Sequence, residues 1–241
     1  MFTLYKKKEV IFAVIWIVAY SVIMTVIRSN YGDESLPMLI GLTVFWILIN
    51  LFVSVNHLED KYGLKKWPKN MKSLLFIIPM WVLMTGNLWD GFELSYTGKE
   101  LVFATLSMMI VGFVEEMLFR GFLFKALESK HGIVPAVIIS ALTFGIGHIV
   151  NLFSGQATAE TILQIVFAVS WGFMLTMVYY KGGSMLPCIL AHTFIDVSSL
   201  YGADNATVDM IYVVVTIVVA IAYSIYLAKI KTPEKSGTSV A

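Results

Sequence analysis

The chain has 241 residues, of which 58% are hydrophobic and only 14% are charged, and its mean hydropathy is +0.80. This composition excludes an ordinary soluble globule and is typical of a protein that crosses a membrane several times. The net charge of +1 says nothing about nucleic acid, but the chain has no basic patch with interleaved aromatic residues, so no nucleic-acid partner is predicted. The single cysteine, Cys188, excludes an internal disulfide and a thiol-based metal site.

Long apolar runs separated by short polar segments predict an all-α, polytopic membrane helix bundle with about eight transmembrane helices. In chain order, the predicted spans are residues 10–27, 37–55, 74–89, 101–127, 134–150, 160–180, 185–201 and 208–228. The first run is interpreted as an uncleaved span, because it continues well past the weak cleavage site at residues 19–21. We expect the polar tail after residue 229 to be disordered.

One structural domain is expected, made of three consecutive parts. Residues 1–100 hold spans one to three, residues 101–201 hold a polar core on spans four to seven, and residues 202–241 hold the last span and the tail. If the N-terminus is cytoplasmic, all but two of the seventeen Lys and Arg residues fall on the inner side; Arg28 and Lys99 are the exceptions. This positive-inside pattern predicts a multi-pass protein of the cell membrane with both termini cytoplasmic.

Three charged residues interrupt the predicted span 101–127, namely Glu115, Glu116 and Arg120. A charge at the centre of a membrane helix costs about 2.5 to 3.5 kcal/mol, so such residues usually face a protein interior or a water-filled cavity. Glu116 and Arg120 are four residues apart, share a helix face and can neutralise each other. Glu115 is rotated by about 100° from Glu116, which leaves it free for chemistry.

Three further ionisable residues lie in predicted spans: His148 on the fifth, and His192 with Asp196 on the seventh. His192 and Asp196 are four residues apart and share a helix face. At about 1.5 Å per residue, these groups and Glu115 lie at similar depths, so we expect them to meet in one cavity. A carboxylate that takes a proton from water, beside imidazoles that polarise a carbonyl or hold a metal, makes a hydrolytic site.

Small and hydroxylated residues on the same spans are interpreted as packing positions. Ser140 and Ser170 are expected to bond the backbone or pack between helices. Ala141 and Gly145 have the small-xxx-small spacing of closely packed membrane helices.

Taken together, the polar motifs resemble those of the CPBP family of intramembrane proteases, which comprises the CAAX proteases and the bacteriocin-processing enzymes also called Abi proteins. The motifs are EExxxR (Glu115, Glu116, Arg120), FxxxH (Phe144, His148) and HxxxD (His192, Asp196), each on its own predicted membrane helix. The likeness covers residues 101–201. It implies that Glu115 activates water, and that Glu116, Arg120 and Phe144 support the site.

The same resemblance implies that His148 and His192 are catalytic, by binding either the substrate carbonyl or a metal ion, and that Asp196 supports or joins them. Members of the family often have Asn at the position of Asp196, and an ionised Asp cannot donate a hydrogen bond to an oxyanion. Orienting His192 or binding a metal suits Asp196 better. Three ligands from His148, His192 and Asp196 or Glu115 would suit a catalytic zinc ion, and a metal-free mechanism is the alternative.

The sequence therefore predicts an endopeptidase, resembling CAAX prenyl endopeptidases and expected to be a metalloendopeptidase, that cleaves a peptide or protein substrate at the lipid bilayer. Nothing in the chain identifies a prenylated substrate, and processing of a secreted peptide, of a bacteriocin, or a role in immunity is equally open. One alternative is a non-enzymatic scaffold or immunity protein that binds a partner such as a sensor kinase. An ion-coupled transporter is disfavoured, because no pair of broken helices occupies corresponding halves. The oligomeric state is left open.

Overall fold

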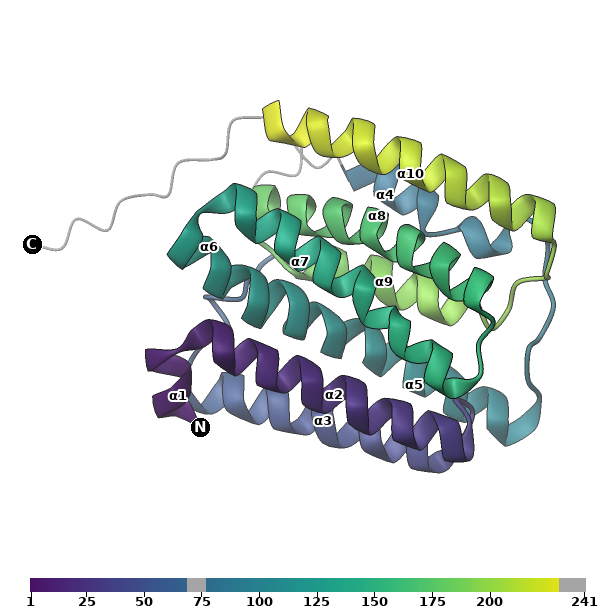
Figure 1. Cartoon of the computed structure of the whole chain (residues 1–241), viewed down its shortest axis with the longest axis horizontal. Helices are drawn as coiled ribbons and strands as arrows, with labels where there is room; N and C mark the ends of the chain where they lie inside the picture. The colour runs from purple at the N-terminus through teal and green to yellow at the C-terminus, as the bar shows by residue number, and fades with distance from the viewer. Residues whose placement is uncertain (69–76, 230–241) are drawn as a thin grey trace, which may run out of the picture.

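The computed structural model describes residues 1–68 and 77–229, which form a bundle of helices (Figure 1). In chain order, the helices are α1 (Phe2–Lys7), α2 (Glu9–Tyr31), α3 (Leu36–Val55), α4 (Ile78–Leu83), η2 (Gly86–Leu88), α5 (Gly98–Glu116), η3 (Met117–Phe124), α6 (Lys125–His131), α7 (Ile133–Gly147), η4 (His148–Ser154), α8 (Thr158–Gly182), α9 (Leu186–Ser198) and α10 (Ala206–Lys229). Here η2 and η4 are 3₁₀-helices, and η3 is a π-helix. The predicted polytopic helical bundle is confirmed.

Within the described residues, six helical segments are long and apolar enough to cross a membrane. They are α2, α3, the continuous segment α5–η3–α6, α7 with η4, α8, and α10. Helix α9 is apolar but has only 13 residues. Six is fewer than the about eight transmembrane helices predicted, because the described parts of the predicted spans 74–89 and 185–201 form only short helices.

The predicted span 74–89 is broken where the chain meets α9 and α10. Its described part, from residue 77, forms only the short helices α4 and η2, and residues 74–76 lie outside the described residues. Thr85 Oγ1 donates a hydrogen bond to the carbonyl of Val82, which competes with helix continuation. Asn87 Nδ2 donates to the carbonyl of Ile195 on α9, so this segment gives up regular helix to contact the helix that carries His192.

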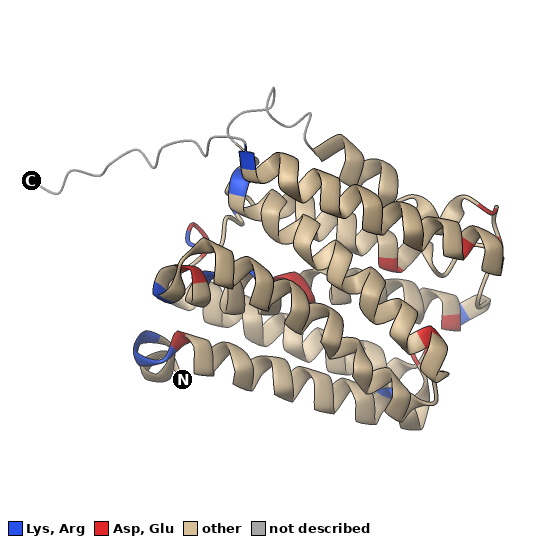
Figure 2. Cartoon of the chain, turned by 45° about the horizontal axis from the view of Figure 1, so that its top comes forward, with Lys and Arg blue, Asp and Glu red and all other residues tan. Residues whose placement is uncertain are grey.

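The two ends of the bundle differ in charge. Helix α1 and the last turn of α10 lie at the same end, on the left in Figure 1, and Figure 2 shows most Lys and Arg residues there. Helix α1 and the last turn of α10 thus lie on one side of the bundle, while the cytoplasmic location predicted for both termini stays a prediction. Arg120, counted among the inner cations from the sequence, is completely buried instead. The polar tail from residue 230 lies outside the described residues.

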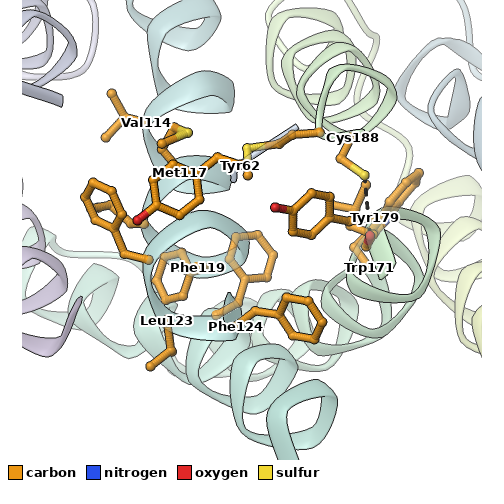
Figure 3. Close-up of a cluster of buried hydrophobic side chains, with 14 of the residues drawn as sticks. Tyr62, Val114, Met117, Phe119, Leu123, Phe124, Trp171, Tyr179 and Cys188 are labelled. Carbon is orange, nitrogen blue, oxygen red and sulfur yellow. Dashed lines mark hydrogen bonds between the residues drawn. The ribbon is translucent and has the colours of Figure 1, made fainter. Parts of the chain in front are cut away.

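An aromatic cluster fills the half of the bundle nearest the termini. Phe122 on η3 lies against Phe12 and Trp16 of α2, Phe52 of α3 and Tyr62, with ring centroids 5.2 to 6.0 Å apart. On its other side η3 packs against α7 and α8, through Phe119 on Phe144 and Phe124 on Tyr179, and Figure 3 shows side chains of this part of the core. Such pairs hold the ends of several helices in fixed register.

Helices α7 and α8 approach each other through small residues. A Cβ added at Gly145 would lie 2.7 Å from the backbone nitrogen of Val169, and one added at Gly172 would lie 3.0 Å from Cα of Ala141. Neither position has room for a side chain without displacing backbone. The predicted role of Ala141 and Gly145 in close helix packing is confirmed.

Candidate active site

The two adjacent glutamates end α5 at the point where the helix changes type. Glu116 is completely buried, and its Oε1 atom lies 3.1 Å from Nη1 of Arg120, which is also completely buried. The guanidinium carbon of Arg120 stands 4.1 Å from the ring centre of Phe144. The predicted neutralising pair therefore exists, and Phe144 adds a cation–π contact that supports the arginine.

Widening of the helix at η3 leaves a carbonyl that a neighbouring helix satisfies. A π-helix bonds residues five apart, and short π segments occur often at functional sites. Ser140 Oγ on α7 donates a hydrogen bond of 2.9 Å to the carbonyl of Phe119, in the buried interior. Ser140 is thus a backbone-bonding residue, as predicted, and it ties α7 to the helix that carries the glutamates.

His192 lies among three carboxylates. Its Nδ1 is 2.8 Å from Glu116 Oε1, while its Nε2 is 3.4 Å from Asp196 Oδ2 and 3.8 Å from Glu115 Oε2. Since an ionised carboxylate accepts only, Nδ1 carries the proton that it donates to Glu116. Glu116 thus fixes the orientation of the imidazole, in addition to pairing with Arg120.

Close packing of α9 on α5 makes the contact between His192 and Glu116 possible. A Cβ added at Gly112 would lie 2.7 Å from the backbone nitrogen of Thr193 and 2.8 Å from its Cα. Only glycine lets the two backbones approach so closely here. The residue next to Thr193 is His192, so Gly112 sets the distance between α5 and the part of α9 that carries His192.

Glu115 is held by a residue that was not expected in the site. Tyr20 on α2 donates a hydrogen bond of 2.9 Å from its hydroxyl to Glu115 Oε1. Membrane tyrosines concentrate at the interface with water, and Tyr20 lies instead in the middle of an apolar run. The position of Tyr20 in the middle of an apolar run was the signal by which the sequence could have indicated a role in the site. The bond leaves Oε2 of Glu115 as the oxygen that faces His192.

His148 begins η4, directly after α7. Its Nδ1 lies 3.2 Å from the carbonyl of Phe144, and its ring packs edge-on against Phe144 with centroids 5.5 Å apart. The ring of Phe144 also contacts His192 at 5.4 Å. One aromatic side chain therefore positions both imidazoles and the guanidinium of Arg120.

Two cavities meet at these side chains. The first, of about 620 Å³, is largely polar, and the residues that line it include Tyr20, Arg28, Glu115, His148, His192 and Asp196. The second, of about 470 Å³, has mainly apolar walls, and it shares His148, His192 and Asp196 but adds Phe167, Trp171 and Tyr212. The structure thus brings the four predicted catalytic residues to one place, between a polar cavity and an apolar one.

A chain of hydrogen bonds near the site was not expected from the sequence. Arg28 Nε donates a hydrogen bond of 2.7 Å to Asp33 Oδ1, and Arg28 Nη1 donates one of 2.7 Å to Asn151 Oδ1. Asn151 Nδ2 in turn donates to Gln164 Oε1, also over 2.7 Å. The chain ties η4 to α2 and α8, and so it fixes the helix on which His148 stands.

The arrangement does not fit a zinc site with three protein ligands. In the described part of the chain, no group of three or more His, Cys, Asp or Glu side chains is placed to hold a metal ion. His192 and His148 direct Nδ1 to Glu116 and to the Phe144 carbonyl, which leaves Nε2 free on each ring; metal-binding histidines have the same orientation, so the disagreement with zinc lies in the number of gathered ligands and not in the imidazoles.

The segment that carries the three polar motifs resembles a known protein family. Residues 97–198 match the family model described as type II CAAX prenyl endopeptidase, Rce1-like. A search of curated proteins and a search of solved structures found no match. The matched segment runs from the start of α5 to the end of α9 and contains all three motifs, which supports a membrane protease. Residues 97–198 of this chain are therefore similar to the Rce1-like CAAX prenyl endopeptidases, and this match supports assignment to the CPBP/CAAX protease family.

Proposed function

We propose that the protein is an intramembrane endopeptidase of the cell membrane that hydrolyses a peptide bond in a membrane-associated or secreted peptide. The observation that carries the proposal is the placement of Glu115 and His192. Their side chains lie 3.8 Å apart on the wall of a polar cavity, and each is held by a second residue, Tyr20 and Glu116 respectively.

In the first step, Glu115 acts as the general base. Its Oε1 is occupied by the Tyr20 hydroxyl, so Oε2 takes a proton from a water molecule in the cavity. The water oxygen forms a bond to the carbonyl carbon of the scissile peptide, and the carbonyl oxygen becomes an oxyanion. A positioned base of this kind contributes about 10² to 10⁴ in rate.

Stabilisation of the oxyanion falls to the imidazole of His192. With Nδ1 bound to Glu116, a protonated His192 presents Nε2–H toward the cavity, and the Glu116 carboxylate stabilises the imidazolium. Asp196, 3.4 Å from the same Nε2, keeps the ring in place but cannot donate to the oxyanion while ionised. His148 is proposed to contact the substrate from the other side of Phe144.

Collapse of the intermediate completes the reaction. The carbon–nitrogen bond breaks as the Glu115 carboxyl returns its proton to the leaving amine nitrogen. The products are a new carboxyl terminus and a new amino terminus, and Glu115 is again ionised. The apolar cavity beside Trp171 would accept an apolar part of the substrate, which suits a peptide embedded partly in lipid.

The test is cleavage of membrane-bound fluorogenic peptides by the purified protein in liposomes, with and without a prenyl group on the peptide. Wild type is compared with Glu115→Gln and His192→Ala, and all three are assayed with chelator and with added zinc. We expect cleavage by wild type and loss in both folded variants. Loss with chelator that zinc restores would revive the zinc alternative.

The scaffold alternative makes the opposite prediction. If Glu115→Gln cleaves like wild type, or if no peptide is cleaved while Glu115→Gln retains the protein's cellular phenotype, the protease proposal fails. Binding of a partner such as a sensor kinase would then be tested by co-purification, with bacteriocin processing and self-immunity as the phenotypes to score.

A further inference from the structure

The end of the bundle opposite the termini is acidic. The end that holds α1, α6 and the last turns of α8 and α10 is here called the lysine-rich end, because Lys and Arg gather there in Figure 2. The lysines of these segments and of the loop after α3 are Lys6, Lys7, Lys8, Lys61, Lys65, Lys66, Lys125, Lys130, Lys181 and Lys229. The opposite end, here called the acidic end, carries Asp33, Glu34, Asp90, Glu93, Glu100, Glu160, Asp204 and Asp209, with Arg28 and Lys99 as the cations (Figure 2). The positive-inside rule places the lysine-rich end in the cytoplasm.

The polar cavity extends to the acidic end. Its outer lining comes from the end of α2, the turn that follows it, the loop before α5 and η4, and includes Asp33, Glu34, Tyr96, Ser154 and Gln156. In the described part of the chain, none of the lysines of the lysine-rich end lines it. Burial and the neighbouring carboxylates of Glu34 and Asp33 raise the pKa of Tyr96, which agrees with a negative potential at this opening.

Toward the lysine-rich end the path is closed by packed side chains. The cavity ends near Phe119, and beyond that residue every position of η3 is buried. Phe122, with Phe12 and Phe52 around it, fills the space between α2, α3 and η3. A peptide therefore cannot reach Glu115 from the lysine-rich end without unpacking this cluster.

The depth of the site suits a short extended peptide. Tyr20, which bonds Glu115, and Arg28, at the opening, both line the cavity and lie eight residues apart on α2. At 1.5 Å per residue the separation along the helix is about 12 Å. An extended chain covers about 3.3 to 3.6 Å per residue, so three to four residues reach from the opening to Glu115.

We propose that substrate enters from the acidic, extracytoplasmic end, and that it is a peptide segment presented there with basic residues near the cleaved bond. The proposal rests on the proposed function for the cleavage itself, but not for the side of access. A substrate confined to the cytoplasm would not meet this opening. Asp33 is paired with Arg28, so the carboxylate of Glu34 at this opening and that of Glu160 on the neighbouring apolar cavity would attract Lys and Arg side chains and repel acidic ones.

Sidedness is tested by labelling single cysteines with a membrane-impermeant maleimide in intact protoplasts and in inverted vesicles. Glu34→Cys reports the opening, and Lys130→Cys, exposed at the end of α6, is the matched control. The buried Cys188 supplies the background in wild type. We expect Glu34→Cys to react in protoplasts and Lys130→Cys only in inverted vesicles. The reverse pattern overturns the proposal, whether or not the protein cleaves any peptide.

The substrate side is tested in sealed proteoliposomes of known orientation. Peptide added on the acidic side is expected to be cleaved, with several-fold lower KM when Lys or Arg flanks the bond than when Glu does. Labelled Glu34→Cys should lose most of this cleavage, whereas labelled Lys130→Cys should keep it. Cleavage only of peptide added on the lysine-rich side would overturn the access proposal and leave the protease proposal standing.

Discussion

One continuous helical segment, α5–η3–α6, carries both the proposed base Glu115 and much of the core packing, in two unlike halves. In α5 only 5 of 19 residues are buried, and Glu115 faces a polar cavity. In η3 all 8 residues are buried, and aromatic side chains surround them. The pair Glu116–Arg120 crosses the boundary between the halves. A reacting carboxylate needs access to water, and the comparison shows that its position is set by a neighbouring half from which water is excluded.

Removing the charge from the open half should have the largest effect. Glu115→Gln keeps the shape of the side chain and an acceptor for Tyr20 but cannot take a proton from water, so we expect cleavage to fall by about 10² to 10⁴. The melting temperature in detergent should stay close to that of wild type. Glu100→Gln, in the exposed first turn of α5, is the matched control and should keep full activity. An active Glu115→Gln enzyme would refute the assignment of the base.

Removing the charge of Arg120 from η3, the packed half, should destabilise the fold and not only reduce the activity. Arg120→Met leaves Glu116 buried without its cation, which typically costs about 3 to 5 kcal/mol. Thermal unfolding in detergent measures the loss. The double variant Arg120→Met with Glu116→Gln should recover part of it, because no uncompensated charge remains. Equal stability of the single variant and wild type would contradict the neutralising role.

Tyr20→Phe tests the support of the open half by α2. It removes one hydrogen bond to a charged group, worth about 1.5 to 3 kcal/mol, and so we expect a loss of about 10- to 100-fold in kcat if the bond orients Glu115 in the transition state. A change in KM alone would indicate a role in substrate binding instead. Tyr201→Phe, whose hydroxyl bonds Thr105 away from the glutamates, is the matched control.

Gly112→Ala tests the distance between α5 and α9. The added methyl group would press on the backbone of Thr193, and overpacking of this kind costs about 1 to 3 kcal/mol. Because His192 is adjacent to Thr193, we expect the loss of transition-state free energy, calculated from kcat/KM, to exceed the loss of unfolding free energy. At Gly147 an added Cβ would meet only Phe119, at 3.9 Å, so Gly147→Ala should be tolerated. Because alanine forms helix better than glycine, helix propensity cannot explain a loss at Gly112, and similar losses in both variants would contradict the special packing role of Gly112.

The smallest effect is expected at the lysine-rich end. Lys61 Nζ donates two hydrogen bonds of 2.6 Å, one to Glu9 Oε1 and one to the Tyr5 hydroxyl. Burial alone would lower its pKa, but these bonds raise it above 10.5. The raised pKa stabilises the fold fully below pH 10.5, and this contribution is lost as pH rises through the folded-state pKa. Since Lys61 is partly exposed, Lys61→Met should cost less than about 1 kcal/mol near neutral pH, measured by thermal unfolding. A larger loss would mean that this pair holds α1 in place.

The number of membrane helices shows where prediction from apolar runs alone is wrong. The run 74–89 has the composition of a membrane helix, yet Thr85 and Asn87 bond to backbone carbonyls and the described part forms only short helices. Hydropathy reports how well a segment tolerates lipid, but does not report whether other helices surround it. A segment packed against α9 and α10 can break its helix, because protein groups satisfy the freed backbone.

The amino-acid sequence alone determined the membrane class, the neutralising pair on one helix and the three motifs, because spacing along a helix decides which residues share a face. Tertiary structure decided the rest. That Tyr20 bonds Glu115, that Glu116 rather than Asp196 bonds Nδ1 of His192, and that the cavity opens at the acidic end all depend on contacts between helices. Those contacts follow from side-chain packing at positions such as Gly112, where a single added carbon would move the site apart.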